Sequence, residues 1–266
     1  NNRNSIQNST VREVIKIISN LLGRVWVSGK YSSWESAKEN SKGYENFKIF
    51  DQIKNIYVSK IKKYNFHEFY ERDGLLFNKK IKDSELLFFV KQVYKVNKKI
   101  KVVDFGGSLG SLYFSNYNFI KEYINEWSIV EQKNFVDFGN KFLKKNNFSF
   151  FYDLKKCIKN KSPNTAIFSE SLQYTEKPYN LLKIISKSKI DFILLHNIPF
   201  NITKKDQYRV QYVPKKIYDA SYPITIFSFN FFLSFLKKNN FKILSITNLK
   251  SPFFKISYKS LIIQKM

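Results

Sequence analysis

The sequence predicts an α/β protein in which a mainly parallel β-sheet carries helices on both faces. From Ile100 onward, short apolar runs alternate with segments long enough for crossover helices. The last two runs are joined by only a short loop around Pro252, which favours an antiparallel hairpin at the sheet edge. Because the residues before Ile100 show helical periodicity instead, we expect a helical cap over residues 1–97 and the sheet within residues 98–266.

The N-terminal region carries several helical patterns. Residues 11–22 place apolar side chains at helical spacing among basic ones, which predicts a basic amphipathic helix. Such a helix packs on its own domain or, as the less favoured alternative, lies on a membrane surface. Ser32 and Glu35 have capping-box spacing and predict the start of a second helix. The patterns over residues 47–61 and 83–96 predict two more.

Short apolar runs predict the strands of the sheet. The runs cover residues 100–105, 127–132, 148–153, 164–170, 190–197, 241–248 and 257–266. Pro199, Pro214 and Pro223 crowd the segment after the fifth run. They predict a long, structured loop at a place where functional loops often lie.

The charge balance sets limits on the partners. The chain of 266 residues has 46 basic and 21 acidic side chains, a formal charge of +25. Nucleic acid still ranks last, because the lysines are spread along the chain and no aromatic RNA-binding signature is present. With no charge-free apolar run of bilayer length and no secretory leader, we expect a cytoplasmic protein. Peripheral contact with the inner membrane through the basic N-terminal helix is the alternative.

Cysteine and histidine are scarce. Cys157 is the only cysteine, and His67 and His196 are the only histidines. This composition excludes a disulfide framework and disfavours a Cys/His metal cluster, so we predict no metal site. Cys157 lies in a lysine-rich amphipathic stretch and is interpreted as a packed thiol.

The segment VVDFGGSLG, at the end of the first predicted strand, is the first candidate ligand site. Ligands bind outside the carboxyl ends of the strands in a parallel sheet. Gly106, Gly107 and Gly110 allow a sharp turn and a close approach of the backbone to a ligand. A dinucleotide requires glycine where Ser108 stands, and Asp104 would repel a pyrophosphate. S-adenosylmethionine (SAM) has no phosphate and carries a positive charge, which a carboxylate attracts.

Two further acids end the next two predicted strands. Glu131, followed by Gln132, stands where a carboxylate can bind a ribose diol, and Asp153 stands where it can bind the adenine amine. Each acid alone can equally be a helix cap or a turn residue. Together with Asp104 they favour SAM as the cofactor over a dinucleotide.

Motifs spread from Trp26 to the end of the chain carry a resemblance to a known family: GKYSSWESA, GYENF, YERDGLLF, VVDFGGSLGS, WSIVEQ, SLQYTEKP and VQYVPKKIYDASYP. In them the chain resembles SAM-dependent methyltransferases encoded mostly in bacterial surface-polysaccharide gene clusters. The resemblance implies a class I, Rossmann-like methyltransferase fold with a seven-stranded mixed sheet. It also implies a glycan or a nucleotide- or lipid-linked sugar as substrate, and polysaccharide-assembly proteins as partners. The family's fifth strand ends in Asp-Arg-Thr, whereas this chain has His196, Asn197 and Ile198.

Methyl transfer to a hydroxyl requires alignment of donor and acceptor and removal of the hydroxyl proton. His196, at the end of the fifth predicted strand, is the candidate base because imidazole titrates near neutrality. A structural role for His196 is the alternative. In the segment FSESLQYTEKP, we expect Glu170, Ser171 and Gln173 to line the cofactor and Tyr174 to face the acceptor, with simple packing as the alternative for Tyr174.

The segments YERDG and YRVQYVPKKIYDASYP are expected to form lids over the carboxyl edge of the sheet. Arg72 and Arg209 lie in these segments and stand out in a chain so rich in lysine. Arginine binds carboxylates and phosphates in a bidentate manner, so both are expected to bind an acidic sugar or the carboxylate of the cofactor. An internal ion pair is the alternative. Tyr218, in the second lid, is also expected to contact the substrate.

The leading hypothesis is therefore a SAM-dependent O-methyltransferase acting on a bacterial cell-surface glycan or its precursor. The departure at residues 196–198 motivates an alternative, a catalytically inactive methyltransferase-fold protein that helps assemble a polysaccharide machine. The charge of +25 motivates a third, an RNA-directed methyltransferase.

Overall fold

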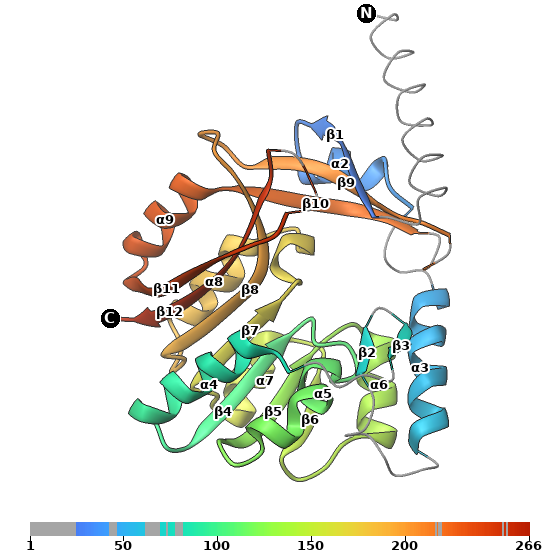
Figure 1. The fold of residues 1–266 in the computed structure, drawn as a ribbon, viewed down its shortest axis with the longest axis vertical. Helices are drawn as coiled ribbons and strands as arrows, with labels where there is room; N and C mark the ends of the chain where they lie inside the picture. Colours follow the sequence, from blue (N-terminus) through green and yellow to red (C-terminus); the bar gives the residue numbers. More distant parts are fainter. Residues whose placement is uncertain are drawn as a thin grey trace, which may run out of the picture.

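The computed structural model describes residues 25–42, 47–61, 70–72, 74–77, 82–215, 217, 220–251, 253 and 255–266. The predicted helix over residues 11–22, Pro252 itself and Tyr218 lie outside the described residues. A large mixed sheet forms the centre of the molecule (Figure 1).

All the predicted strands form. They are β4 (Ile100–Phe105), β5 (Ile124–Val130), β6 (Phe148–Phe151), β7 (Thr165–Ser169), β8 (Phe192–Asn201), β11 (Phe241–Leu249) and β12 (Ser257–Lys265). The order β6-β5-β4-β7-β8 is parallel, and β12 pairs antiparallel with both β8 and β11. The order reverses between β4 and β7, which makes the carboxyl ends of these two strands the natural place for a ligand.

Helices cover both faces of this sheet and create two cores. Val102 and Val103, adjacent in β4, point to opposite faces and belong to different apolar clusters. The Val102 cluster receives side chains from α3 (Phe47–Ile61), α4 (Ser84–Val96), α5 (Ser111–Ile120) and α6 (Lys133–Phe142). The Val103 cluster receives them from α7 (Leu154–Lys161), α8 (Pro178–Ser186) and α9 (Phe229–Lys238). Both cores therefore hold β4 and its carboxyl end firmly in place.

The segment after β8 differs from its prediction. The expected proline-rich loop is mostly a pair of antiparallel strands, β9 (Gln207–Val213) and β10 (Ala220–Ser228), and β10 continues the main sheet by pairing with the end of β8. Pro199 lies within β8 and Pro223 within β10. Apolar residues at every second position, such as Ile224 and Ile226, bury one face of the hairpin, and this burial outweighs the turn preference of proline.

The N-terminal region also departs from the all-helical expectation. Residues Trp26–Tyr31 form β1, which pairs antiparallel with β9. The next helix, α2 (Trp34–Glu39), begins after Ser33, whose side chain accepts a hydrogen bond from the Ser36 amide at 3.1 Å. The capping residue is therefore Ser33 and not Ser32. The predicted helices over residues 47–61 and 83–96 are confirmed as α3 and α4.

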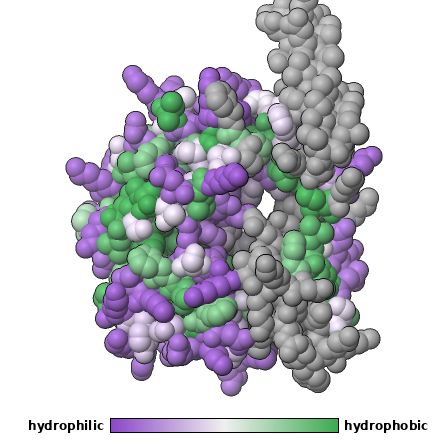
Figure 2. Space-filling view, viewed as in Figure 1, coloured by the Kyte–Doolittle hydropathy of each residue, from purple (hydrophilic) through white to green (hydrophobic). Residues whose placement is uncertain are grey.

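The described surface is largely polar. Figure 2 shows a mostly hydrophilic face with separate apolar patches. Within the residues that the structure describes, no helix is both long and apolar enough to cross a bilayer. Cys157 is fully buried, as expected for a packed thiol, and burial raises its pKa to about 12.

The close contact of α6 with β6 allows a stability test. A Cβ atom added to Gly139 would lie 2.6 Å from ring atoms of the buried Phe150. Alanine favours a helix over glycine by about 1 kcal/mol, whereas overpacking a core costs about 1–3 kcal/mol. We expect Gly139→Ala to lower the free energy of unfolding by about 1 kcal/mol in urea denaturation. Lys141→Ala, exposed on the same helix, is the control, and a stabilised Gly139→Ala protein would contradict this packing.

Candidate active site

A cleft of about 1800 Å³ lies over the carboxyl ends of the parallel strands. Its floor comes from the ends of β4, β5, β7 and β8, and its roof comes from the β9–β10 hairpin, which Figure 1 shows arching over the main sheet together with β1 and α2. Both predicted lid segments contribute. Glu71, in β2 (Tyr70–Arg72), and Gln211 and Tyr222, in the hairpin, line the cleft.

The glycines after β4 allow the chain to fold tightly around Asp104. A Cβ atom on Gly107 would lie 2.5 Å from Asp104 Oδ2. A Cβ atom on Gly106, whose φ is +72°, would lie 2.6 Å from Cβ of Ser171. Gly110, with a φ of +95°, occupies the N-cap position of α5. Larger residues at these positions would push the loop away from the carboxylate and from the segment that follows β7.

Asp104 is a buried carboxyl with one oxygen that lacks a partner. Its side chain is 1% exposed, and Oδ2 accepts a hydrogen bond from Trp127 Nε1 at 3.3 Å. Oδ1 has no hydrogen-bond partner among the described residues. Burial raises the pKa of Asp104 to about 7; the Trp127 bond opposes this rise and the negative charge of Glu131 adds to it. The site thus holds a carboxyl that would ionise more readily beside a cation.

Glu131 directly follows the neighbouring strand β5, and its carboxyl also has a raised pKa. Oε2 accepts a hydrogen bond from the backbone amide of Gln132 at 2.5 Å. Burial raises the pKa of Glu131 to about 7, against the backbone hydrogen bonds from Gln132 and Ser108, which lower it. Asp153 is exposed, lines the same cleft and caps α7 by accepting from the Lys156 amide at 2.9 Å. The acids that were predicted at three strand ends therefore meet at one cleft.

Other buried polar atoms in the cleft lack hydrogen bonds within the described part of the chain. They belong to Glu85 Oε2, Ser108 Oγ, Ser171 Oγ and Gln173 Oε1. Gln173 is 1% exposed and Ser171 is 9% exposed, so neither atom has ready access to bulk water. Because buried polar groups are nearly always hydrogen-bonded, these orphaned atoms indicate that a polar ligand completes the site. They fit the hydrogen-bonding groups of a nucleoside amino acid such as SAM.

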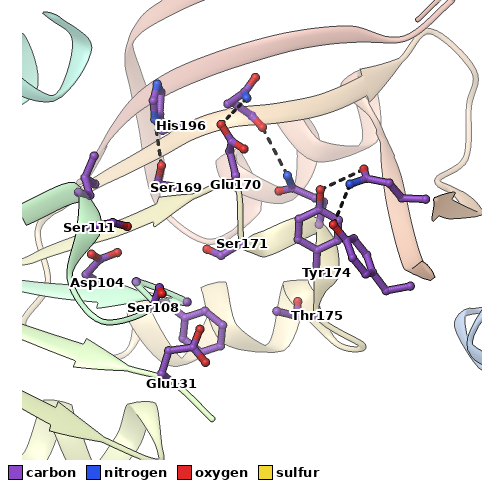
Figure 3. A pocket seen from close by; sticks show the side chains of 18 of the residues that line it. Asp104, Ser108, Ser111, Glu131, Ser169, Glu170, Ser171, Tyr174, Thr175 and His196 are labelled. Carbon is purple, nitrogen blue, oxygen red and sulfur yellow. Dashed lines mark hydrogen bonds between the residues drawn. The ribbon is translucent and has the colours of Figure 1, made fainter. Parts of the chain in front are cut away.

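His196 lies across the cleft from Asp104 and Glu131 (Figure 3). Its Nδ1 lies 3.0 Å from Ser169 Oγ, and its Nε2 forms an ion pair with Glu85 Oε2 at 3.2 Å. Burial alone would lower the pKa of His196, but the contact with Glu85 and the charges of nearby carboxylates raise it overall. The predicted base thus lies in the cleft, but in the middle of β8 and not at its end, because β8 continues to Asn201. Of the acids near its ring, the sequence analysis identified Glu170 but not Asp83 or Glu85.

Glu170 and Asn197 support this side of the cleft. Both have a positive φ, 52° and 57°, although neither is glycine. Asn197 Nδ2 donates a hydrogen bond to Glu170 Oε1 at 2.7 Å, which links the end of β7 to the middle of β8. Backbone strain of this kind persists only where surrounding contacts enforce it, and it is common at functional sites.

Tyr174 lines the cleft but its hydroxyl is already engaged. It donates to Gln211 Oε1 at 3.1 Å, and Gln211 Nε2 donates to the Tyr222 hydroxyl at 3.0 Å. Burial raises the pKa of Tyr174, so the phenol stays protonated. This network ties the short helix after β7 to the hairpin above it.

The structure gives less information about the predicted substrate-binding residues. Arg209 lies on β9 outside the cleft lining, and its Nη2 donates to Gln207 Oε1 at 2.8 Å. Arg72 belongs to β2, but its side chain lies outside the described residues, as does all of Tyr218. Binding of the substrate by these three residues remains a prediction.

The charge of the cleft is opposite to that of the chain. Basic residues outnumber acidic ones 46 to 21 in the whole sequence. Among the described residues that line the cleft, acids prevail: Glu71, Asp83, Glu85, Asp104, Glu131, Asp153, Glu170 and Glu176, against Lys38, Lys42, Lys82 and Lys250. The described residues contain no cluster of His, Cys, Asp and Glu able to hold a metal ion. An organic cation suits this cleft better than a polyanion does.

The raised pKa of Asp104 predicts a pH-dependent cost in stability. The folded protein holds the carboxyl proton up to about pH 7, whereas the unfolded chain loses it near 3.8. The free energy of unfolding therefore falls as pH rises between these values, by a few kcal/mol at most. We expect Asp104→Asn to be more stable than the parent by about 1–3 kcal/mol at pH 8 and nearly equal at pH 4, measured by denaturant titration.

The exposed carboxyl of Asp51, paired with Lys54, provides the matched control. Asp51→Asn should show no such pH-dependent gain. If Asp104→Asn were equally destabilised at both pH values, Asp104 would be ionised at little cost in the folded protein.

Comparisons with known proteins identify the fold. No protein-family model matches the chain, and no curated protein sequence matches it. Among solved structures, the N-terminal domain of EvdMO1, crystallised in the presence of SAH (S-adenosylhomocysteine) and D-fucose, has a TM-score of 0.52 and 8% identity over 80% of this chain and 97% of that chain. A SAM-dependent methyltransferase from Clostridium acetobutylicum ATCC 824 has a TM-score of 0.45 and 10% identity over 70% of this chain and 92% of its own. With its parallel-rich sheet, the chain has a class I, Rossmann-like methyltransferase fold.

Proposed function

We propose that this protein is a SAM-dependent methyltransferase that methylates a hydroxyl group of a glycan or glycan precursor. The observation that carries the proposal is the pair of carboxyls, Asp104 and Glu131, at adjacent strand ends beside a glycine loop. Asp104 has a buried oxygen without a partner, and both carboxyls have a pKa of about 7. A cationic ligand that donates hydrogen bonds would stabilise the ionised form of both.

Different residues of the cleft are assigned to different parts of the cofactor. When bound, SAM supplies a methyl group activated by its sulfonium charge. Asp104 can accept a hydrogen bond from the ammonium group, and Glu131 can accept two from the ribose diol. We assign Asp153 and Gln132, which also line the cleft, to the adenine, and we assign Ser171 and Gln173, whose buried oxygens have no partner among the described residues, to other polar groups of the cofactor.

The acceptor side supports a neutral, hydroxyl-bearing substrate. Asp83, Glu85 and Glu170 bring negative charge close to His196, which disfavours phosphate and carboxylate groups there. RNA is disfavoured for the same reason, in spite of the charge of the whole chain. The EvdMO1 domain, which shares the fold, was crystallised with a neutral sugar, D-fucose. We therefore place a neutral sugar ahead of an acidic one as the acceptor.

Isothermal titration with SAM and SAH tests the proposal. We expect both to bind, and Asp104→Asn and Glu131→Gln each to weaken SAM binding about 10- to 100-fold, since a hydrogen bond to a charged group contributes about 1.5–3 kcal/mol. Asp191→Asn, an exposed carboxyl at the other end of β8, is the matched control and should bind normally. Failure of the parent protein to bind either compound would refute the cofactor assignment.

The same titration should depend on pH. SAM binding requires the ionised carboxyls, whose pKa values are about 7 without ligand. The affinity for SAM should therefore fall as pH decreases from 8 to 6, by up to about tenfold per unit for each carboxyl that must lose a proton. Glu131→Gln should show a shallower dependence than the parent. A flat profile would mean that neither carboxyl changes its protonation on binding.

A methyl-transfer assay distinguishes an active enzyme from a protein that binds SAM without catalysis. Labelled SAM is incubated with neutral sugars, with their uronic-acid counterparts and with RNA, and methylated products are detected by mass spectrometry. We expect transfer to the neutral sugars only. SAM binding without any transfer would favour the alternative of a scaffold protein in polysaccharide assembly.

A further inference from the structure

A row of polar side chains in the wall of the cleft includes the ring of His196. Ser169 Oγ lies 3.0 Å from Nδ1 on one side, and Glu85 Oε2 lies 3.2 Å from Nε2 on the other. Asp83 Oδ2 adds negative charge 3.8 Å from Nδ1. All four residues line the cleft, and Figure 3 shows Ser169, at the end of β7, beside His196, which lies in the middle of β8. Both ring nitrogens therefore have defined neighbours.

The nearer carboxylate favours one tautomer of the neutral ring. Glu85 Oε2 makes no hydrogen bond among the described residues, but it lies 3.2 Å from Nε2, closer than Asp83 Oδ2 lies to Nδ1 (3.8 Å), so its negative charge favours a proton on Nε2. Nδ1 then carries the lone pair and can accept the proton of the Ser169 hydroxyl. His196 is thus arranged to take a proton from the side that faces Ser169.

The carboxylates around the ring are held by other contacts. Asp83 caps α4 by accepting from the Leu86 amide at 2.8 Å, and Glu170 is bound to Asn197. Ser260, in β12, is a further hydrogen-bonding neighbour of Glu85. The ring therefore faces acids from α4 and from the end of β7, and none of the described groups that shift its pKa is a lysine or arginine.

We propose that Ser169, His196 and Glu85 form a proton relay for the acceptor hydroxyl, with Glu85 as the positioning residue of His196. The proposal rests on the proposed methyltransferase function. Ser169 is the member that contacts the acceptor. Glu85 acts only through the ring, by fixing its tautomer and stabilising its charged form.

The relay balances protons and electrons. The acceptor oxygen uses a lone pair to form the new oxygen–carbon bond, while the electron pair of the breaking carbon–sulfur bond stays on sulfur and leaves a neutral thioether. The acceptor proton moves to Ser169 Oγ as the original Ser169 proton moves to His196 Nδ1. The resulting imidazolium is stabilised by Glu85 and Asp83, and its proton is returned to solvent after the product has left.

The chain has only two histidines, which makes the relay directly observable. In a His67→Gln background, long-range proton–nitrogen NMR spectra report the single ring of His196. We expect the Nε2–H tautomer at high pH. Glu85→Gln should lower the pKa of His196 by about one unit, because it removes the adjacent negative charge. Ser169→Ala should leave that pKa unchanged or raise it, and Asp191→Asn, remote from the ring, should not change it.

Kinetics at saturating SAM provide the second measurement, using the neutral sugar with the highest turnover. Ser169→Ala and Glu85→Gln should each lower kcat about 10²-fold or more, the usual contribution of a positioned base. Glu85→Gln should also move the acid limb of the kcat profile to lower pH, in step with the NMR value, with KM for SAM unchanged. If Glu85 had a purely structural role, Glu85→Gln would reduce thermal stability without moving the acid limb of the kcat–pH profile.

The outcomes distinguish failure of the relay from failure of the proposed function. An Nδ1–H tautomer, or a His196 pKa unaffected by Glu85→Gln, overturns the relay even if SAM binds and turns over. Absence of SAM binding by the parent protein overturns the proposed function, whatever the tautomer and pKa of His196. Full activity of Ser169→Ala would remove Ser169 from the mechanism and also overturn the relay.

Discussion

The structure of the cleft depends on one buried carboxyl, that of Asp104 at the end of β4. The Trp127 indole holds one of its oxygens, and the glycine loop folds so closely over it that a methyl group on Gly107 would collide with it. Burial of this kind costs stability when the group is ionised. A chain selected only for stability would place an apolar residue at this point, so the carboxyl indicates that the site binds something positive or hydrogen-bonding.

The rest of the cleft is built around that point by segments from distant parts of the sequence. β10 pairs in parallel with the end of β8, and β9 pairs antiparallel with β10. β1, from the N-terminal region, pairs with β9. The hairpin is joined to the floor through the Tyr174–Gln211–Tyr222 hydrogen bonds. Because the roof is a continuation of the main sheet and not a separate loop, its position is coupled to β8, the strand that carries His196. A shift of the hairpin would therefore also disturb the candidate base.

The sequence predicted the parts of the fold that depend on local pattern. The strands from β4 to β8, the helices α3 and α4 and the acids at the strand ends all follow from periodicity over a few residues. The hairpin was missed because Pro199 and Pro223 suggested a loop, whereas burial against β1 and β8 decides the outcome. Glu85 was missed for a different reason: it lies on the polar side of a helix, and only the tertiary fold brings it to His196. No local pattern distinguishes such a carboxylate from one that faces solvent.

The opposite charges of the cleft and the whole chain bear on the cofactor cycle. If the proposed function holds, the ligand enters as a cation and leaves as a neutral thioether, while the acids of the cleft keep their charge. The acidic cleft then attracts the methyl donor more strongly than its product, and the difference acts mainly on the sulfur, since the two molecules are otherwise alike. The same field raises the pKa of His196 and makes it a better proton acceptor at the moment when the positive charge on sulfur disappears. Cofactor selection and base strength would therefore share one cause, the set of carboxylates that α4, β4, β5 and β7 bring to the cleft.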